Sequence, residues 1–352
     1  MSLALSAKQR REWDENGYLV IEGFFDESDI FAVESALTRV WLDRPANVTV
    51  DDLVTNRRIR ASQVADDELD HLFKVNDLYL IDPTVRCVIS SKRVVAAVGE
   101  LLGDVPVVCN TLSLEKGSQQ GSHLDTLYMT PASDFGLVAT WMALEDVHQD
   151  AGPLRYFPGS HRIKPFRFST GNVHYVPSEM PHWFEYMDES VAKHGLEETR
   201  FLAKRGDLLI WNALLFHGGS PINDLSRTRN SLVTHFVTRT DSISQKCRLR
   251  AVEGGAGLWM DRPQHSVSGE AMSPEQLRLA ERSEGERLVT AVRNGNTSAC
   301  IEDQLAATLG VLAETERRLR ITQRQLDATR SSRSWRITRP LRTIRALHRN
   351  SK

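Results

Sequence analysis

Hydrophobic residues near the N-terminus recur with helical spacing on either side of one β-prone stretch. The pattern predicts a helix over residues 7–16, a strand over 17–25 and a second helix over 27 to about 42. A further helix is expected over residues 84–102, because Gly103 follows it as a typical C-terminal signal. These elements precede a region in which the pattern changes.

Short β-prone stretches, separated by Gly, Pro, Asn and Asp, come next. They cover residues 105–115, 123–129, 136–144, 154–160, 207–216 and 230–240. Many short strands with such turn signals predict a β-sandwich or barrel. Residues 161–200 interrupt this rhythm as an insertion over one mouth of the sheet, and loops of that length are either functional lids or disordered. Their aromatic residues over 174–186 either line a substrate pocket or pack for structural reasons alone.

Residues 241–298 are weakly patterned, apart from a helix predicted from Pro274 to about Val292. Leucines then recur at seven-residue spacing, at Leu305, Leu312, Leu319 and Leu326. They indicate either a short coiled coil, which would permit a homo-oligomer, or one amphipathic helix on the body. We therefore divide the chain into a β-rich domain (1–245), an extension packed on or linked to it (246–298), a heptad helix (299–330) and a tail (331–352).

Charge is distributed unevenly along the chain. The net charge is −2, yet the residues from Arg330 onward hold eight Lys or Arg and no Asp or Glu, which leaves −10 on the other 329 residues. Arginine recurs at every third position from Arg330 to Arg345, with Trp335 and aliphatic residues between. This composition suits the interface of an anionic membrane, and a solvated tail explains it equally well. No nucleic-acid-binding fold is recognised, so no nucleic acid is expected as a partner.

The overall composition, 41% hydrophobic and 26% charged, is that of a globular protein. The cysteines lie scattered at Cys87, Cys109, Cys247 and Cys300, without a C-x-x-C pair, which suggests reduced thiols. The N-terminus turns polar after five residues, too soon for a signal peptide. No apolar run approaches the ~18 residues of a membrane span. We therefore expect a cytoplasmic protein.

Candidate metal ligands lie in two β-prone stretches. Non-haem iron(II) oxygenases use two imidazoles and one carboxylate on one face of the metal, which leaves three positions open. On a strand, residues i and i+2 point the same way, so His123 and Asp125 would present an imidazole and a carboxylate side by side. His217, at the end of a distant apolar strand, supplies the third ligand.

A second His-x-Asp triplet, His148-Gln149-Asp150, competes with the first. It lies in the polar segment EDVHQDAGP, in which Asp150 and Gly152 are typical turn residues. This context favours a surface turn for His148, so we expect the metal at the first triplet.

Ordered segments of the chain resemble the phytanoyl-CoA dioxygenase family of iron(II)- and 2-oxoglutarate-dependent oxygenases. They are SAKQRREWDENGYLVIEGFF at the N-terminus, the stretch with His123 and Asp125, AGPLRYFPGSH with a typically structural His161, RGDLLIWNALLFHGGSPIND with His217, and RNSLVTHF. The resemblance covers roughly residues 7–240. It implies a mainly β fold with flanking helices around a double-stranded β-helix, a jelly-roll core of the cupin kind.

The resemblance also implies the cofactors. Fe²⁺ would be held by His123, Asp125 and His217, with 2-oxoglutarate as co-substrate and O₂ as oxidant. Arg229 would bind the distal carboxylate of 2-oxoglutarate, since a guanidinium is a planar fork that matches a carboxylate. Arg227, two residues earlier, is the rival for this role.

Further contacts to the co-substrate follow from the same resemblance. Trp141 is expected beside 2-oxoglutarate, or else in the barrel core. Lys116 and Ser220 are candidate polar contacts, although the family's serine lies nearer the distal histidine than Ser220 does. An intact Asp125 predicts hydroxylation, or another oxidation without halogen, because halogenating relatives need a small residue there to admit a halide.

Substrate and context are indicated less directly. Arg162, Lys164 and Arg167 would suit a phosphate or carboxylate on a small substrate. The tail sequence SRSWRITRPLR (332–342) resembles that of bacterial surface-polysaccharide enzymes, which implies glycan-building partners near the inner membrane and a sugar or glycolipid substrate. The alternatives are hydroxylation of an acyl-CoA or another small metabolite, and a non-catalytic scaffold with an oxygenase fold.

Overall fold

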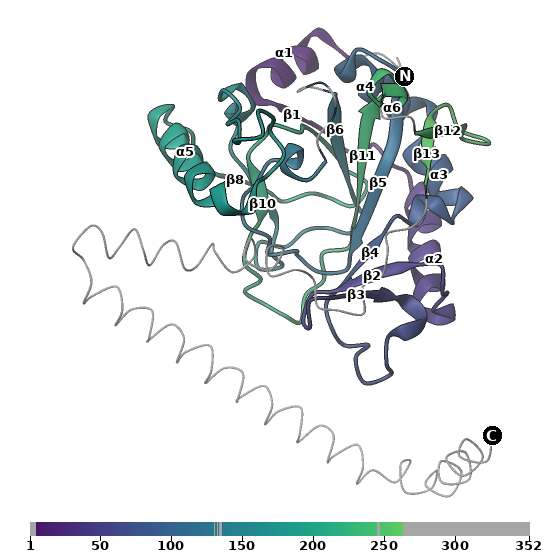
Figure 1. Ribbon diagram of the computed structural model, residues 1–352. Helices are drawn as coiled ribbons and strands as arrows, with labels where there is room; N and C mark the ends of the chain where they lie inside the picture. The colour runs from purple at the N-terminus through teal and green to yellow at the C-terminus, as the bar shows by residue number, and fades with distance from the viewer. Residues whose placement is uncertain (1–4, 130, 132, 134–135, 245–246, 263–352) are drawn as a thin grey trace, which may run out of the picture. The chain divides into compact units, whose positions relative to one another are not determined.

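The computed structural model describes residues 5–129, 131, 133, 136–244 and 247–262. Its helices are α1 (Ala7–Asn16), α2 (Glu27–Asp43), α3 (Pro83–Ile89), α4 (Lys92–Leu102), α5 (Met180–Lys193) and α6 (Arg239–Ser244). Its strands are β1 (Tyr18–Ile21), β2 (Thr49–Asp52), β3 (Arg57–Arg60), β4 (Phe73–Asn76), β5 (Pro106–Leu114), β6 (Leu137–Ala143), β7 (Leu154–Tyr156), β8 (Thr199–Phe201), β9 (Leu208–Asn212), β10 (His217–Gly219), β11 (Ser231–Thr238), β12 (Arg248–Ala251) and β13 (Leu258–Asp261). The chain is mainly β with flanking helices, as predicted (Figure 1).

The strands form one large and one small sheet. The large sheet has the order β1-β9-β6-β11-β5-β4-β2-β3, and β13 joins it by pairing in parallel with β5. The small sheet has the order β10-β7-β8. Tyr156 of β7 and Phe201 of β8 share a buried cluster with Trp141 of β6 and Trp211 of β9, so the small sheet covers one face of the large one.

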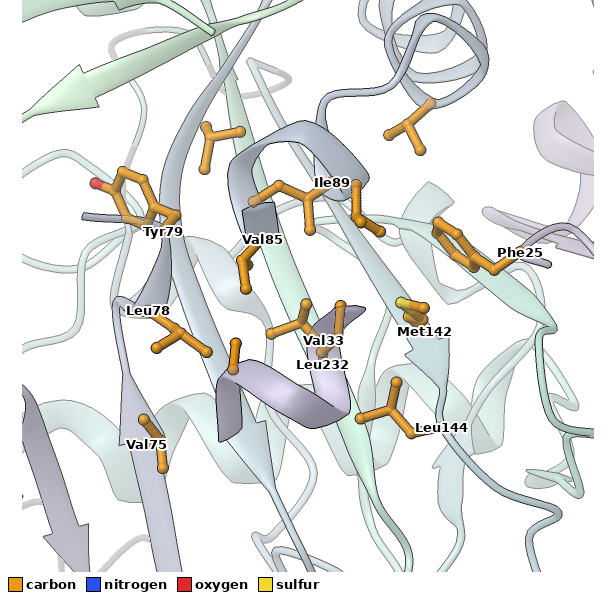
Figure 2. Packing of buried hydrophobic residues seen from close by; sticks show 14 of the residues in the cluster. Phe25, Val33, Val75, Leu78, Tyr79, Val85, Ile89, Met142, Leu144 and Leu232 are labelled. Carbon is orange, nitrogen blue, oxygen red and sulfur yellow. The ribbon is translucent and has the colours of Figure 1, made fainter. Parts of the chain in front are cut away.

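The helices α2, α3 and α4 cover the other face of the large sheet (Figure 1). Figure 2 shows part of this core, in which Val33 of α2 and Val85 of α3 lie near Met142 and Leu232 of the sheet. Alternate residues of a strand point to opposite faces, so a strand that is buried on both faces is apolar throughout. This explains the continuous apolar run LLIW in β9.

The structure corrects four of the predicted elements. The helix expected over 84–102 is two helices, because Ser91 caps the N-terminus of α4 and its side chain accepts a hydrogen bond from the backbone N–H of Val94. Residues 125–127 form a 3₁₀ turn instead of a strand, and the apolar stretch 207–216 leaves the sheet at Asn212. The insertion contains α5, and its aromatic residues share a buried cluster with Leu124, Leu127, Leu214 and Phe216.

Strands β2 to β4 were not predicted, because their sequences TVDD, RRIR and FKVN are rich in charge. Asp51 of β2 is fully buried and forms ion pairs with Arg58 of β3 and Lys74 of β4. The lysine and the arginine outweigh burial and lower the pKa of Asp51 to about 2. Charged side chains on neighbouring strands therefore pair with one another. For this reason a hydropathy pattern does not predict β2 to β4.

The C-terminal extension is described as far as Arg262, and β12 and β13 place it on the large sheet. The predicted helix from Pro274, the heptad helix and the basic tail lie outside the described residues. Within the described part of the chain, every helix is too short or too polar to cross a bilayer.

Candidate metal centre

Two distant segments meet inside the barrel through their backbones. His123 and His217 form an isolated antiparallel bridge, in which each N–H donates to the other's carbonyl oxygen, at 2.7 and 3.1 Å. His217 is the first residue of β10, in the small sheet, and therefore does not end the apolar strand as predicted. Asp125 begins the 3₁₀ turn that follows His123, and this turn, in place of a strand, brings the carboxylate beside the imidazoles.

The side chains of His123, Asp125 and His217 converge. Oδ1 of Asp125 lies 3.8 Å from Nε2 of His123 and 3.6 Å from Nε2 of His217, and all three residues are buried. Two imidazoles and one carboxylate on one side of a shared point are the ligand set of non-haem iron(II) oxygenases. The donor atoms therefore fit an Fe²⁺ ion.

Backbone carbonyl groups fix the tautomer of both histidines. Nδ1 of His123 donates to the carbonyl of Gly121, and Nδ1 of His217 donates to that of Leu215, both at 2.9 Å. Each Nε2 is thereby left unprotonated and available to a metal. Burial and the nearby His217 lower the pKa of His123 to about 4, which keeps its imidazole neutral near pH 7.

The second oxygen of Asp125 has different neighbours. Nε1 of Trp211 donates to Oδ2 at 2.8 Å, and Nε2 of His235 lies 3.7 Å away. Burial would raise the pKa of Asp125, but the surrounding His217, His235 and His123 hold it below its ordinary value. Trp211 and His235 were not predicted as site residues. Trp211 follows Leu209 by two residues in β9, and His235 follows Val233 by two residues in β11. Because alternate residues of a strand point to the same face, both side chains point into the barrel with Leu209 and Val233.

Arg229 lies beside Trp141 of the same barrel, with part of its side chain unsatisfied. It is buried, Nη1 donates to the carbonyl of Gly152 at 3.2 Å, and Nε has no hydrogen-bond partner. The guanidinium carbon lies 5.6 Å from the ring of Trp141. Burial lowers the pKa of Arg229 to about 10, so it keeps its charge near pH 7.

Nε1 of Trp141, Oγ of Ser220 and Oγ of Ser231 are also buried without partners. The Trp141 ring lies against the Arg229 guanidinium, the backbone of Ser220 lies beside Gly152, whose carbonyl accepts from Arg229, and Ser231 follows Arg229 by two residues. Buried polar groups in proteins are normally hydrogen-bonded, so such a group of donors marks a place for an acceptor. A carboxylate of 2-oxoglutarate fits this donor set. Ser231 was missed by sequence reasoning, although it follows Arg229 by two residues and thus shares its face.

The remaining predicted residues lie elsewhere. Arg227 is exposed and pairs with Asp224, which leaves Arg229 as the candidate anchor. Lys116 donates to the carbonyl of Leu225 in an exposed position. His148 and Asp150 are exposed in a turn, as expected for the rival triplet.

The described residues include one other group with metal-ligand spacing, formed by Asp52, Glu68 and His71. Arg57 pairs with both carboxylates of this group. Asp52 also accepts hydrogen bonds from His71 and from Thr55. These contacts make it a satisfied ion-pair cluster.

The family model described as phytanoyl-CoA dioxygenase (PhyH) matches residues 13–228 of the sequence. The chain belongs to the phytanoyl-CoA dioxygenase family. The match spans both histidines and the aspartate of the metal centre and ends beside Arg229. Together with this donor set, membership confirms that the protein is an iron(II)- and 2-oxoglutarate-dependent oxygenase.

Named relatives agree with this assignment. The peroxisomal phytanoyl-CoA dioxygenase of Bos taurus is 24% identical over 251 residues, which cover 66% of this chain and 68% of the relative. The Homo sapiens enzyme is 25% identical over 248 residues, covering 66% and 69%.

Solved structures of other proteins have a similar fold. EctD from S. alaskensis with 2-oxoglutarate and 5-hydroxyectoine has a TM-score of 0.52 and 18% identity, over 76% of this chain and 86% of that one. The carbocyclase SnoK from nogalamycin biosynthesis has a TM-score of 0.51 and 14% identity, over 74% and 94%. These likenesses confirm the predicted jelly-roll core.

Proposed function

We propose that this oxygenase hydroxylates a small organic substrate, with Fe²⁺ held by His123, Asp125 and His217. The observation that carries the proposal is the convergence of two fixed Nε2 atoms and one carboxylate oxygen at a buried point. Three ligands on one face leave three positions for the co-substrate and O₂.

The protein's own residues hold the co-substrate. Arg229 would bind the distal carboxylate of 2-oxoglutarate through its planar fork, and Ser220 and Ser231 would complete the contacts with their unpartnered hydroxyls. The other end of 2-oxoglutarate would chelate a bound Fe²⁺, which would supply the chemistry that couples decarboxylation to succinate with oxidation of a substrate C–H bond. The buried aromatic side chains of Trp141 and Trp211 exclude water from the barrel.

Asp125 supports hydroxylation in place of halogenation. As a metal ligand, its carboxylate would fill the position that a halide needs. An inactive scaffold is disfavoured, because a degenerate site has no reason to keep three converging ligands and a buried Arg229 with an unpartnered Nε.

For the substrate we propose a sugar or glycolipid intermediate of bacterial surface-polysaccharide assembly. The tail motif of residues 332–342 supports this, and it also supports a peripheral position at the cytoplasmic face of the inner membrane, beside glycan-building enzymes. Near the metal centre, the ring of Tyr128 lies edge-on to His123, and Tyr175 of the insertion lies against Tyr128. These rings suit the apolar face of a sugar. Trp183 is buried in the cluster of the insertion, where its ring packs on Phe184 and Phe216.

An acyl-CoA is the second candidate substrate. The relatives of Bos taurus and Homo sapiens are named phytanoyl-CoA dioxygenases, which favours this class. The two proposals can be distinguished by experiment, because only the true substrate should be hydroxylated in step with succinate formation.

The test is succinate formation by the pure protein with Fe²⁺, 2-oxoglutarate and panels of nucleotide sugars, lipid-linked sugars and acyl-CoAs. We expect coupled turnover with a sugar-containing compound, and coupled turnover with acyl-CoAs alone would transfer the proposal to the second class. Asp125→Ala should abolish succinate formation, whereas Asp150→Ala, a matched change in the exposed triplet, should leave it intact. The reverse pattern would move the iron to residues 148–150.

A further inference from the structure

Trp211 lies between ligands of the metal centre. Its ring centroid is 5.2 Å from that of His217 and 6.4 Å from that of His235, and the residue is 2% exposed. Nε1 donates a hydrogen bond of 2.8 Å to Oδ2 of Asp125. One side chain thus packs against one proposed ligand and is hydrogen-bonded to another.

The two oxygens of Asp125 have separate surroundings. Oδ1 faces the Nε2 atoms of His123 and His217, whereas Oδ2 faces the indole N–H. His235 also approaches Oδ2, but 3.7 Å is beyond hydrogen-bond distance, so Trp211 supplies the hydrogen bond. An indole N–H only donates and does not titrate, so this contact persists at any pH at which the protein is folded.

The strand fixes the indole. Trp211 is paired with Tyr18 on β1 and with Ala139 on β6, so its backbone is held from both sides. A donor on a central strand of the sheet is more rigid than the turn that carries Asp125, and the hydrogen bond stops the carboxylate from rotating about its Cβ–Cγ bond.

We infer that Trp211 is a positioning residue that orients the Asp125 carboxylate so that Oδ1 alone faces the iron. The inference rests on the proposed function, because it requires Asp125 to be a ligand. Partners of this kind, which hold a metal ligand from outside, contribute about 10- to 100-fold to metal affinity or activity. Their loss weakens the metal site while the fold persists.

The experiment is anaerobic equilibrium dialysis against Fe²⁺ alone, which gives the dissociation constant without turnover. Trp211→Phe removes the N–H together with part of the ring. A second variant carries benzothienylalanine at position 211, which keeps the bicyclic shape and replaces N–H by sulfur. The control is Trp183→Phe, an equal change at a Trp that is 1% exposed and packs on Phe184 and Phe216, in another cluster.

We expect both variants at position 211 to bind Fe²⁺ at least tenfold more weakly than wild type, and Trp183→Phe to stay within twofold. A dissociation constant less than tenfold above wild type in the benzothienylalanine variant overturns the inference, even if Trp211→Phe fails to fold. Asp125→Ala separates this failure from that of the proposed function. If Asp125→Ala binds Fe²⁺ as wild type does, Asp125 is no ligand and the proposed function itself fails.

Discussion

Replacing Arg229 with Met should stabilise the ligand-free protein while it destroys binding of 2-oxoglutarate. Arg229 is 3% exposed, and burial lowers its pKa to about 10. At about 1.36 kcal/mol per pKa unit, this lowering corresponds to about 3 kcal/mol of lost hydration. Because the folded-state pKa lies below the unfolded one, the charged guanidinium destabilises the fold at every pH below about 10, including pH 7.

Methionine has a similar length and no charge to desolvate. It gives up the hydrogen bond to Gly152, worth about 1 kcal/mol, and the contact of the cation with Trp141, worth about 1 kcal/mol. The net expectation is a gain of about 1 kcal/mol in the free energy of unfolding. The variant also leaves a carboxylate of 2-oxoglutarate without its charged partner. This should weaken the binding free energy of 2-oxoglutarate by about 3–5 kcal/mol, which raises its KM at least 100-fold.

Urea unfolding of the metal-free protein at pH 7 measures the first effect, and 2-oxoglutarate-dependent succinate formation measures the second. Arg227→Met is the control, because Arg227 is exposed and pairs with Asp224, and it should change both quantities little. The reasoning is refuted if Arg229→Met lowers stability by more than about 1 kcal/mol, or if its KM for 2-oxoglutarate stays within threefold of wild type.

Two further predictions concern stability. The pKa of His123 in the folded protein is about 4, so between pH 4 and the ordinary histidine pKa the protein takes up a proton when it unfolds. The free energy of unfolding of the metal-free protein should therefore fall by up to about 3 kcal/mol as the pH falls from 7 to 4. His123→Gln should remove that part of the pH dependence in urea titrations, and an unchanged slope would contradict the assignment. Arg262→Ala should lower the free energy of unfolding by about 3 kcal/mol, because it leaves the fully buried Asp77 without its charged partner. The exposed Arg250→Ala should cost less than about 1 kcal/mol in the same measurement, and equal losses would disprove the difference.

The sequence predicted those elements whose burial follows a simple period. Helix α2 and the strands β5, β6 and β11 lie close to their expected ranges, because each buries an apolar face against the same core. Helix α1 also lies in its expected range, although none of its residues is buried, because the side chains of Ser6 and Gln9 cap its first turn. Strands β2 to β4 escaped prediction because Asp51 and its partners satisfy one another across the sheet. Such ion pairs depend on which strands become neighbours in the sheet, so they cannot be predicted from the sequence of one segment.

The metal ligands were predictable because the chemistry restricts the residue types. His-x-Asp and a distant His are few in this chain, and the family resemblance selected among them. The local geometry was not predictable, since Asp125 lies in a 3₁₀ turn and His217 begins a strand of the small sheet. Alternation along the strands shows which face Ser231 and Trp211 share, but it does not show what their single polar atoms contact. They were missed because those contacts depend on which segments lie opposite once the barrel has closed.

The central claim is that one buried point between residues 123, 125 and 217 binds iron together with 2-oxoglutarate. Anaerobic addition of Fe²⁺ and 2-oxoglutarate to the pure protein tests it directly through visible absorption. We predict a weak charge-transfer band that saturates at one iron per chain, is lost in Asp125→Ala and persists in Asp150→Ala. A band of equal strength in Asp125→Ala, or no band in the wild-type protein, would contradict the account.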